Sequence, residues 1–157
     1  MNRRRRESRR RETCGYADSE DEETMTDPRL TLSVSTETLA VCRLEKDAPI
    51  PDWALAGSFV SITRTSDELS IVAPQADIPD DTKCVRGWRC LKLEGPFDLS
   101  SIGVLASLTS PLAQAGVSVL ALSTFETDYL LVKKEDLEQA IRVLSEAGYP
   151  IQRRKGN

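Results

Sequence analysis

The spacing of apolar residues between positions 87 and 149 predicts strands and helices in an order that is compatible with few folds. GWRCLKLEG predicts a strand, and VSVLALS and YLLVK flank a polar turn, which is typical of a hairpin. The two helical faces between and after them are Ile102, Leu105, Leu108 and Leu112, then Leu137, Ala140, Ile141 and Leu144. This β-α-β-β-α order, with YPIQ as a candidate last strand, predicts an α+β ferredoxin-like fold (βαββαβ), an antiparallel sheet with helices on one face.

Signals for the ends of both helices stand beside these faces. Gly116 and Gly148 occupy the place where a glycine commonly ends a helix. Pro111 conflicts with a continuous first helix, because a proline inside a helix removes a backbone hydrogen bond, and we expect a kink or an end there. The candidates for capping the start of that helix are Asp98, Ser100 and Ser101.

The preceding residues predict a strand-rich half with one short helix. Alternation over residues 30–44 indicates two strands, separated at 35–37 by a tight turn or a bulge. Proline and aspartate before Trp53 favour one or two helical turns around it. Two apolar stretches joined by a polar turn predict a hairpin over residues 59–72, and residues 74–86 form a connector between the halves.

The two hairpins suggest an internal repeat. VSITRTSDELSIVA (residues 60–73) aligns without a gap on LALSTFETDYLLVK (residues 120–133). A chance match of two hairpins with equal loops is the alternative, because hairpin loops have few lengths. A true repeat predicts two tandem motifs that pair their antiparallel sheets and bury each other's edge strands.

The charge pattern divides the chain into four segments. Residues 1–27 are an arginine-rich and then acidic tail, for which we expect disorder. The folded segments are then an N-terminal half (28–86) and a C-terminal domain (87–152), followed by a basic tail (153–157). Residues 1–24 hold seven Arg and seven Asp or Glu, so the remainder keeps the whole net charge of −4. For the first tail three interpretations stay open: translation from Met25, a solvated tail without a partner, or a binding arm.

Composition excludes several classes of function. Histidine is absent, which removes the commonest catalytic base and metal ligand. None of the four cysteines forms a C-x-x-C pair, so we expect no metal, and we expect Cys42 and Cys90 to be inert buried thiols. An acidic body without a base-stacking platform argues against nucleic-acid binding outside the arginine arm. No apolar run reaches the length of about 18 residues that a membrane span needs, which predicts a cytoplasmic protein.

Residues 93–149 resemble an ACT domain. The match lies in the loop and helix start G-x-F-D-L-x-S-I-G-V-L-A and in the hairpin S-T-F-E-T-D-Y-L-L-V. More narrowly, the segment is similar to short bacterial tandem-ACT proteins and to the ACT pairs of animal cytosolic arginine sensors. The resemblance extends over residues 30–149 if the first half is the partner motif. It implies a regulatory module that binds an amino acid at the seam of two ACT motifs, needs no cofactor and is no enzyme.

The resemblance also implies the site residues. The ligand would lie between the loop 97–103 and the hairpin 123–128, which includes Glu126. Independently, a helix start offers free backbone N–H groups to a carboxylate, and Asp128 suits an ammonium group. The structural alternatives are capping by the serines, tight helix–strand packing at Gly103, and turn closure by Thr127 and Asp128. The expected ligand-binding residues are Asp98, Leu99, Ser100, Ser101, Ile102, Gly103, Ser123, Thr124, Phe125, Thr127 and Asp128.

Three other functions compete with amino-acid binding. The first is a protein–protein interaction or homodimerisation domain without a ligand, which side chains filling the seam would favour. The second is an enzyme that uses Asp98, Glu126 and Asp128 for acid–base catalysis. The third is nucleic-acid binding through Arg3–Arg11, which would weaken steeply with salt.

Overall fold

The computed structural model describes residues 30–95 and 101–153. The strands are β1 (Leu32–Leu44), β2 (Ser61–Arg64), β3 (Leu69–Pro74), β4 (Cys84–Leu93), β5 (Val119–Ser123), β6 (Asp128–Lys133) and β7 (Ile151–Arg153). The helices are α1 (Val104–Gln114) and α2 (Leu137–Glu146), with 3₁₀ turns η1 (Asp52–Leu55), η2 (Gln75–Asp77) and η3 (Lys134–Asp136). From β4 to β7 the order is β-α-β-β-α-β, which confirms the predicted ferredoxin-like order.

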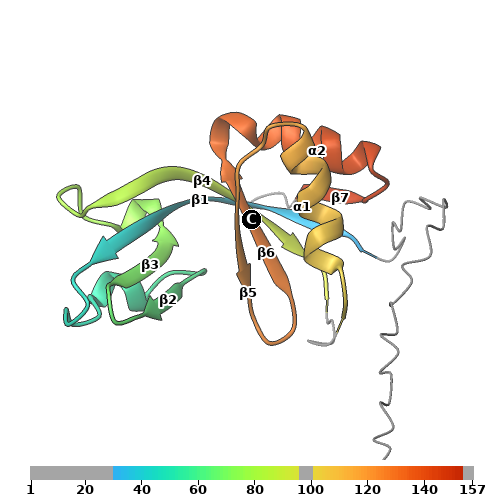
Figure 1. The fold of residues 1–157 in the computed structure, drawn as a ribbon. Helices are drawn as coiled ribbons and strands as arrows, with labels where there is room; N and C mark the ends of the chain where they lie inside the picture. The colour runs from blue at the N-terminus through green and yellow to red at the C-terminus, as the bar shows by residue number, and fades with distance from the viewer. Residues whose placement is uncertain (1–29, 96–100, 154–157) are drawn as a thin grey trace, which may run out of the picture.

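All seven strands belong to one curled sheet with the order β2-β3-β1-β4-β6-β5. Neighbours are antiparallel except for β7, which runs parallel to the first residues of β1. The start of β1 is therefore inserted between β4 and β7, where it pairs with both. Strands β1 and β4 continue into the other half, where β1 also pairs with β3 (Figure 1). The two halves are joined by these two shared strands.

Strand β1 differs from its prediction. Residues 32–44 form one strand rather than two; of the two alternatives predicted for 35–37, the tight turn is wrong and the bulge agrees with an irregularity in that strand. The register with β4 shifts between Val34 and Thr38, as in a bulge, so pairing resumes instead of ending. The Arg89 guanidinium donates a hydrogen bond of 2.7 Å to the carbonyl of Ser35 and so supports the irregular segment.

Both α-helices pack on one face of the C-terminal half (Figure 1). Leu108 and Leu112 of α1 and Leu144 of α2 are fully buried against sheet residues such as Leu91 and Leu130. Burying one such side chain stabilises a fold by about 1.5–3 kcal/mol. Apart from Ile102, which lies before α1 and is exposed, the predicted helical faces are therefore the ones that build this core. Among the described residues no helix is long and apolar enough to cross a membrane.

Pro111 lies inside α1 without ending it, contrary to the expected break. Proline has no N–H, so the carbonyl four residues earlier, at Ser107, loses its helical donor. The hydroxyl of Tyr149 donates a hydrogen bond of 3.3 Å to this carbonyl. Tyr149 is buried beyond the end of α2, and its hydroxyl replaces the missing donor. The helix then ends as predicted, with Gly116 in the left-handed region at φ +75°.

The N-terminal half has a smaller core without a described α-helix. The 3₁₀ turn η1 forms where helical turns were predicted and supplies the buried Ala54, and Ile78 follows η2. A separate apolar cluster on the other face of the sheet joins the two halves, and in it the rings of Phe59 and Tyr129 meet edge to face at 5.0 Å. The fully or nearly buried members of this joining cluster are Leu39, Val72, Cys90 and Leu131.

The two hairpins have equal loops, but the gapless alignment of the repeat is one residue out. Arg64 pairs with Leu69 and Ser123 pairs with Asp128, so the structural equivalence is a shift of 59 residues instead of 60. Under this shift Val72 corresponds to Leu131, and both lie in the joining cluster. A slip of one residue moves every side chain to the other face of a strand, so the gapless alignment matched residues from opposite faces of the sheet.

Candidate ligand-binding pocket

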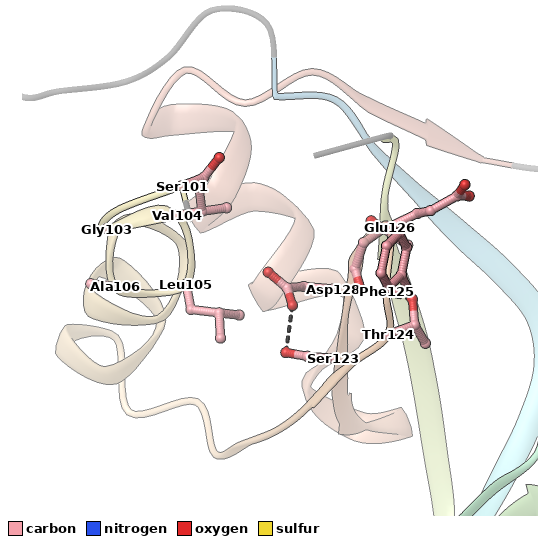
Figure 2. A pocket seen from close by; sticks show the side chains of 11 residues that line it. Ser101, Gly103, Val104, Leu105, Ala106, Ser123, Thr124, Phe125, Glu126 and Asp128 are labelled. Atoms are coloured by element: carbon pink, nitrogen blue, oxygen red, sulfur yellow. Dashed lines mark hydrogen bonds between the residues drawn. The ribbon is translucent and has the colours of Figure 1, made fainter. Parts of the chain in front are cut away.

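A pocket of about 310 Å³ opens between the start of α1 and the β5–β6 hairpin (Figure 2). One wall is the backbone and first side chains of α1, and the other is the hairpin turn with the strand ends beside it. All lining residues described belong to the C-terminal half. They are Ser101, Gly103, Val104, Leu105, Ala106, Ser123, Thr124, Phe125, Glu126, Thr127 and Asp128.

The helix wall begins at Gly103, whose φ of +80° places it in the left-handed region. A β-carbon there would meet no atom within 4 Å, so backbone conformation requires the glycine and tight packing does not. In the described part of the chain no side chain caps this end of α1, which contradicts a capping role for Ser101. Val104, Leu105 and Ala106 of the first turn line the pocket, and N–H groups in the first turn of a helix have no partner within it.

The hairpin wall is a tight turn with its own hydrogen bonds. The Thr124 N–H and hydroxyl both donate to the Thr127 carbonyl, at 2.8 and 3.0 Å. The Thr127 hydroxyl donates to the carbonyl of Leu93 at the end of β4, and the Thr127 residue is only 9% exposed. Thr127 thus closes the turn and links it to the sheet. This agrees with turn closure, which was the predicted alternative to ligand binding for this residue.

Asp128 and Ser123 face each other across the first pair of the hairpin. The Ser123 hydroxyl donates a hydrogen bond of 2.5 Å to Oδ1 of Asp128. In Figure 2 both side chains lie between the hairpin and α1, near Leu105. The second carboxylate oxygen of Asp128 has capacity for a donor from a ligand.

The two walls carry opposite electrostatic character. Asp128 and Glu126 contribute carboxylates on the hairpin side, and no Lys or Arg is among the described lining residues. On the helix side the aligned peptide dipoles of α1 produce a partial positive charge at its N-terminus. A zwitterion with its anionic group at α1 and its cationic group at the hairpin matches this arrangement.

The structure brings together seven of the eleven predicted binding residues. They are Ser101, Gly103, Ser123, Thr124, Phe125, Thr127 and Asp128. Ile102 does not line the pocket and is 99% exposed, and the predicted residues Asp98, Leu99 and Ser100 lie outside the described residues.

The prediction missed Val104, Leu105 and Ala106 and did not count Glu126 among the binding residues. The signal for the first three was the helix start itself, because the residues after a cap present backbone N–H groups whatever their side chains are. For a metal, no cluster of three or more ligating side chains occurs in ranges 30–95 and 101–153.

Comparison with known families divides the chain near residue 82. A model of the ACT domain matches residues 83–146, and a model of an N-terminal domain matches residues 37–81. Among curated proteins, the cytosolic arginine sensor for mTORC1 subunit 1 of Homo sapiens is 42% identical over 58 residues. The match covers 36% of this chain and only 18% of that protein, so the chain corresponds to less than a fifth of it.

Solved structures extend the similarity over most of the chain. A crystal structure of an Agrobacterium tumefaciens protein is 40% identical, with a TM-score of 0.78, and the match covers 83% of this chain and 97% of that one. The regulatory subunit of aspartate kinase from Thermus thermophilus shares the fold at 12% identity and a TM-score of 0.52, over 74% and 96% of the two chains. The family models, the sequence relatives and the fold agree, and the chain belongs to the ACT domain family.

Proposed function

We propose that this protein is a regulatory module that binds a free amino acid in the pocket between α1 and the β5–β6 hairpin. The observation that carries the proposal is a pocket in which a carboxylate faces a helix start that no side chain of residues 30–95 or 101–153 caps. The relatives support it, because one is named an arginine sensor and another a regulatory subunit of an amino-acid kinase. Regulation through binding, without catalysis, is the function proposed.

The α-carboxylate of the ligand would accept hydrogen bonds from the first-turn N–H groups of α1. Val104, Leu105 and Ala106 supply these groups, and the helix dipole adds to the attraction. Its ammonium group, or a cationic side chain, would donate to Asp128, whose carboxylate Ser123 holds in place. Glu126 adds negative charge at the same wall.

The position of the ligand relative to the two halves is refined by the packing. The sequence resemblance implied a ligand at the seam of two ACT motifs. In the joining cluster, apolar side chains of the two halves pack against each other, including Leu39 and Leu131. All described residues that line the pocket lie in the C-terminal half, so we place the ligand in that half alone, between the loop and hairpin that the resemblance indicated.

A domain that only binds a protein partner, including a second copy of itself, is the second candidate. Ile102 is 99% exposed and Phe125 is 81% exposed, and they stand on the two segments that form the pocket walls. If the two side chains belong to one contiguous apolar patch, that patch would mark an interaction surface. Such a domain would bind its partner without any amino acid and would change oligomeric state or partner affinity when Phe125 is replaced.

A thermal-shift screen of the full chain against the twenty L-amino acids at millimolar concentration separates the two functions. A ligand that binds only the native state at a hundredfold excess over Kd stabilises it by about 2.7 kcal/mol. The proposal predicts a raised Tm for one or a few amino acids. No shift with any of them, together with self-association that depends on Phe125, would establish the interaction domain instead.

A further inference from the structure

Two cysteines stand directly opposite each other in the N-terminal half. Cys42 of β1 pairs in register with Cys84 of β4. The next pair along the ladder is hydrogen-bonded, because the N–H of Arg43 donates to the carbonyl of Lys83 at 3.0 Å. Hydrogen-bonded and non-hydrogen-bonded pairs alternate in an antiparallel ladder, so Cys42 and Cys84 form a non-hydrogen-bonded pair. The α-carbons of such pairs are about 4.5 Å apart, within the range of about 4.4–6.8 Å that a disulfide spans.

The two thiols already contact each other, and they differ in access. Their side chains share a hydrogen bond, and both are free thiols. Cys42 is only 1% exposed, whereas Cys84 is partly exposed at the start of its strand. Burial raises the pKa of Cys42 to about 12, and the neighbouring Cys84 contributes to the rise. An oxidant from solvent therefore meets Cys84 first.

A fixed positive charge lies beside the pair. The Arg86 guanidinium lowers the pKa of Cys42 and so opposes the effect of burial. It is held by the carbonyls of Gln75 and Pro79, at 3.3 and 3.0 Å. A cation in this place stabilises the thiolate that must form when the buried sulfur attacks.

We propose that Cys42 and Cys84 are a reversible oxidation site that closes to an intramolecular disulfide under hydrogen peroxide. The Cys84 sulfur attacks one peroxide oxygen, the O–O bond breaks, and water leaves with the thiol proton, which produces a sulfenic acid. The Cys42 sulfur then attacks Sγ of Cys84, the S–S bond forms, the S–O bond breaks, and hydroxide leaves with the Cys42 proton as a second water. Two sulfurs lose one electron each, and one peroxide gains both.

The bond would join the two strands that both halves share, at their N-terminal-half end. Strands β1 and β4 are shared by both halves, and no α-helix of the described residues packs in the apolar cluster that contains Cys42 and Cys84. A disulfide there would close the segment that contains β2 and β3 into a covalent loop and so restrict the unfolded chain. Oxidation should therefore raise the stability of the N-terminal half.

Cys90 provides a matched control within the same strand. It is 3% exposed, and burial raises its pKa to about 12, so it resembles Cys42 in environment. It belongs to the joining cluster, whereas Cys42 packs in the other cluster, on the opposite face of the sheet. Cys90 should therefore form no bond with Cys42 or Cys84.

Tryptic mapping of the full chain tests the proposal, because its four cysteines fall on separate peptides. Cys42 lies on residues 30–43, Cys84 on 84–86, Cys90 on 90–92 and Cys14 on 12–29. The protein is treated with hydrogen peroxide under native conditions, blocked with iodoacetamide and digested without reductant. The proposal predicts that peptides 30–43 and 84–86 appear as one linked species, lighter by two hydrogens, that dithiothreitol separates.

Two variants complete the experiment. Cys90→Ser should leave the linked species and a peroxide-induced rise in Tm unchanged, whereas Cys84→Ser should abolish both. The linked species in the native chain is decisive even if a variant folds poorly. Alkylated peptide 84–86 as the main product, a sulfinic acid on Cys84 without a link, or bonds that involve Cys14 or Cys90 would overturn the proposal.

Discussion

Replacing Asp128 by Asn removes one negative charge from the hairpin wall of the pocket and leaves the size of the side chain nearly unchanged. The Ser123 hydroxyl donates to Oδ1 of Asp128 at 2.5 Å, and the amide oxygen of Asn can accept the same bond. The fold should therefore tolerate the change. What is lost is the charge that the proposed ammonium group of the ligand would meet.

The size of the effect follows from the type of contact. A hydrogen bond to a charged group contributes about 1.5–3 kcal/mol, and every 1.4 kcal/mol is about tenfold in affinity. We expect Asp128→Asn to weaken binding by roughly 10-fold to 100-fold. At a ligand concentration of about a hundredfold over the native Kd, a loss of about 30-fold leaves a stabilisation of about 0.9 kcal/mol where the native chain gains about 2.7 kcal/mol.

The assay is isothermal titration calorimetry with the amino acid that the screen identifies, supported by Tm in the presence and absence of that ligand. Asp81→Asn is the matched control, because Asp81 is exposed in the connector before β4 and lines no part of the described pocket. Its Kd should equal that of the native chain. An Asp128→Asn protein with unchanged Tm and unchanged Kd would refute the assignment of the cationic group to the hairpin wall.

Three further predictions concern the backbone, the core and a buried thiol. Gly103→Ala should cost about 1–2 kcal/mol in urea unfolding, because φ of +80° disfavours a β-carbon although space is free; a loss below about 0.3 kcal/mol would contradict this cause. Tyr149→Phe should cost about 1–3 kcal/mol, since the carbonyl of Ser107 loses its donor beside Pro111, and an unchanged urea midpoint would show that water replaces the hydroxyl. Burial raises the pKa of Cys90 from 9.0 to about 12, so the Cys90 sulfur holds its proton more tightly in the folded state than in the unfolded state. The contribution of this proton to the free energy of unfolding should be fully present below pH 9.0 and fall by about 1.4 kcal/mol per pH unit as the pH rises toward 12. Cys90→Ala should remove this part of the fall. Urea unfolding at a series of pH values measures both.

The order of elements could be predicted because each has a local period. The spacing of Leu105, Leu108 and Leu112 indicates a helix before any contact is known, and the structure places Leu108 and Leu112 in the core. Glycines after both helices marked their ends correctly. Local patterns of this kind do not depend on the rest of the chain.

The shared strands could not be predicted, because they depend on partners distant in the sequence. The polar residues 35–37 looked like a turn, yet pairing with β4 on both sides keeps β1 in one piece. Pro111 looked like a helix end, yet a hydroxyl contributed from Tyr149 supplies the missing donor. The pairing of β1 with both β4 and β7 likewise joins residues that are distant in the sequence, so a local pattern cannot predict it.

The candidate site was predicted in part for a similar reason. The hairpin residues were found because their polar side chains suit a ligand, and five of the predicted ones line the pocket. The first turn of α1 was missed because the apolar spacing began the helix at Ile102, whereas α1 begins at Val104, so the residues of the first turn were not assigned to the site.

The most direct test of amino-acid binding in this pocket is a titration of the ¹⁵N-labelled full chain, followed by amide chemical shifts. The account predicts that one L-amino acid causes saturable shifts at Val104, Leu105 and Ala106 and along the hairpin from Ser123 to Asp128. The β2–β3 hairpin, which has the same loop length but lines no part of the described pocket, should show none. Shifts confined to that hairpin, or no saturable shift with any of the twenty amino acids at millimolar concentration, would contradict the account.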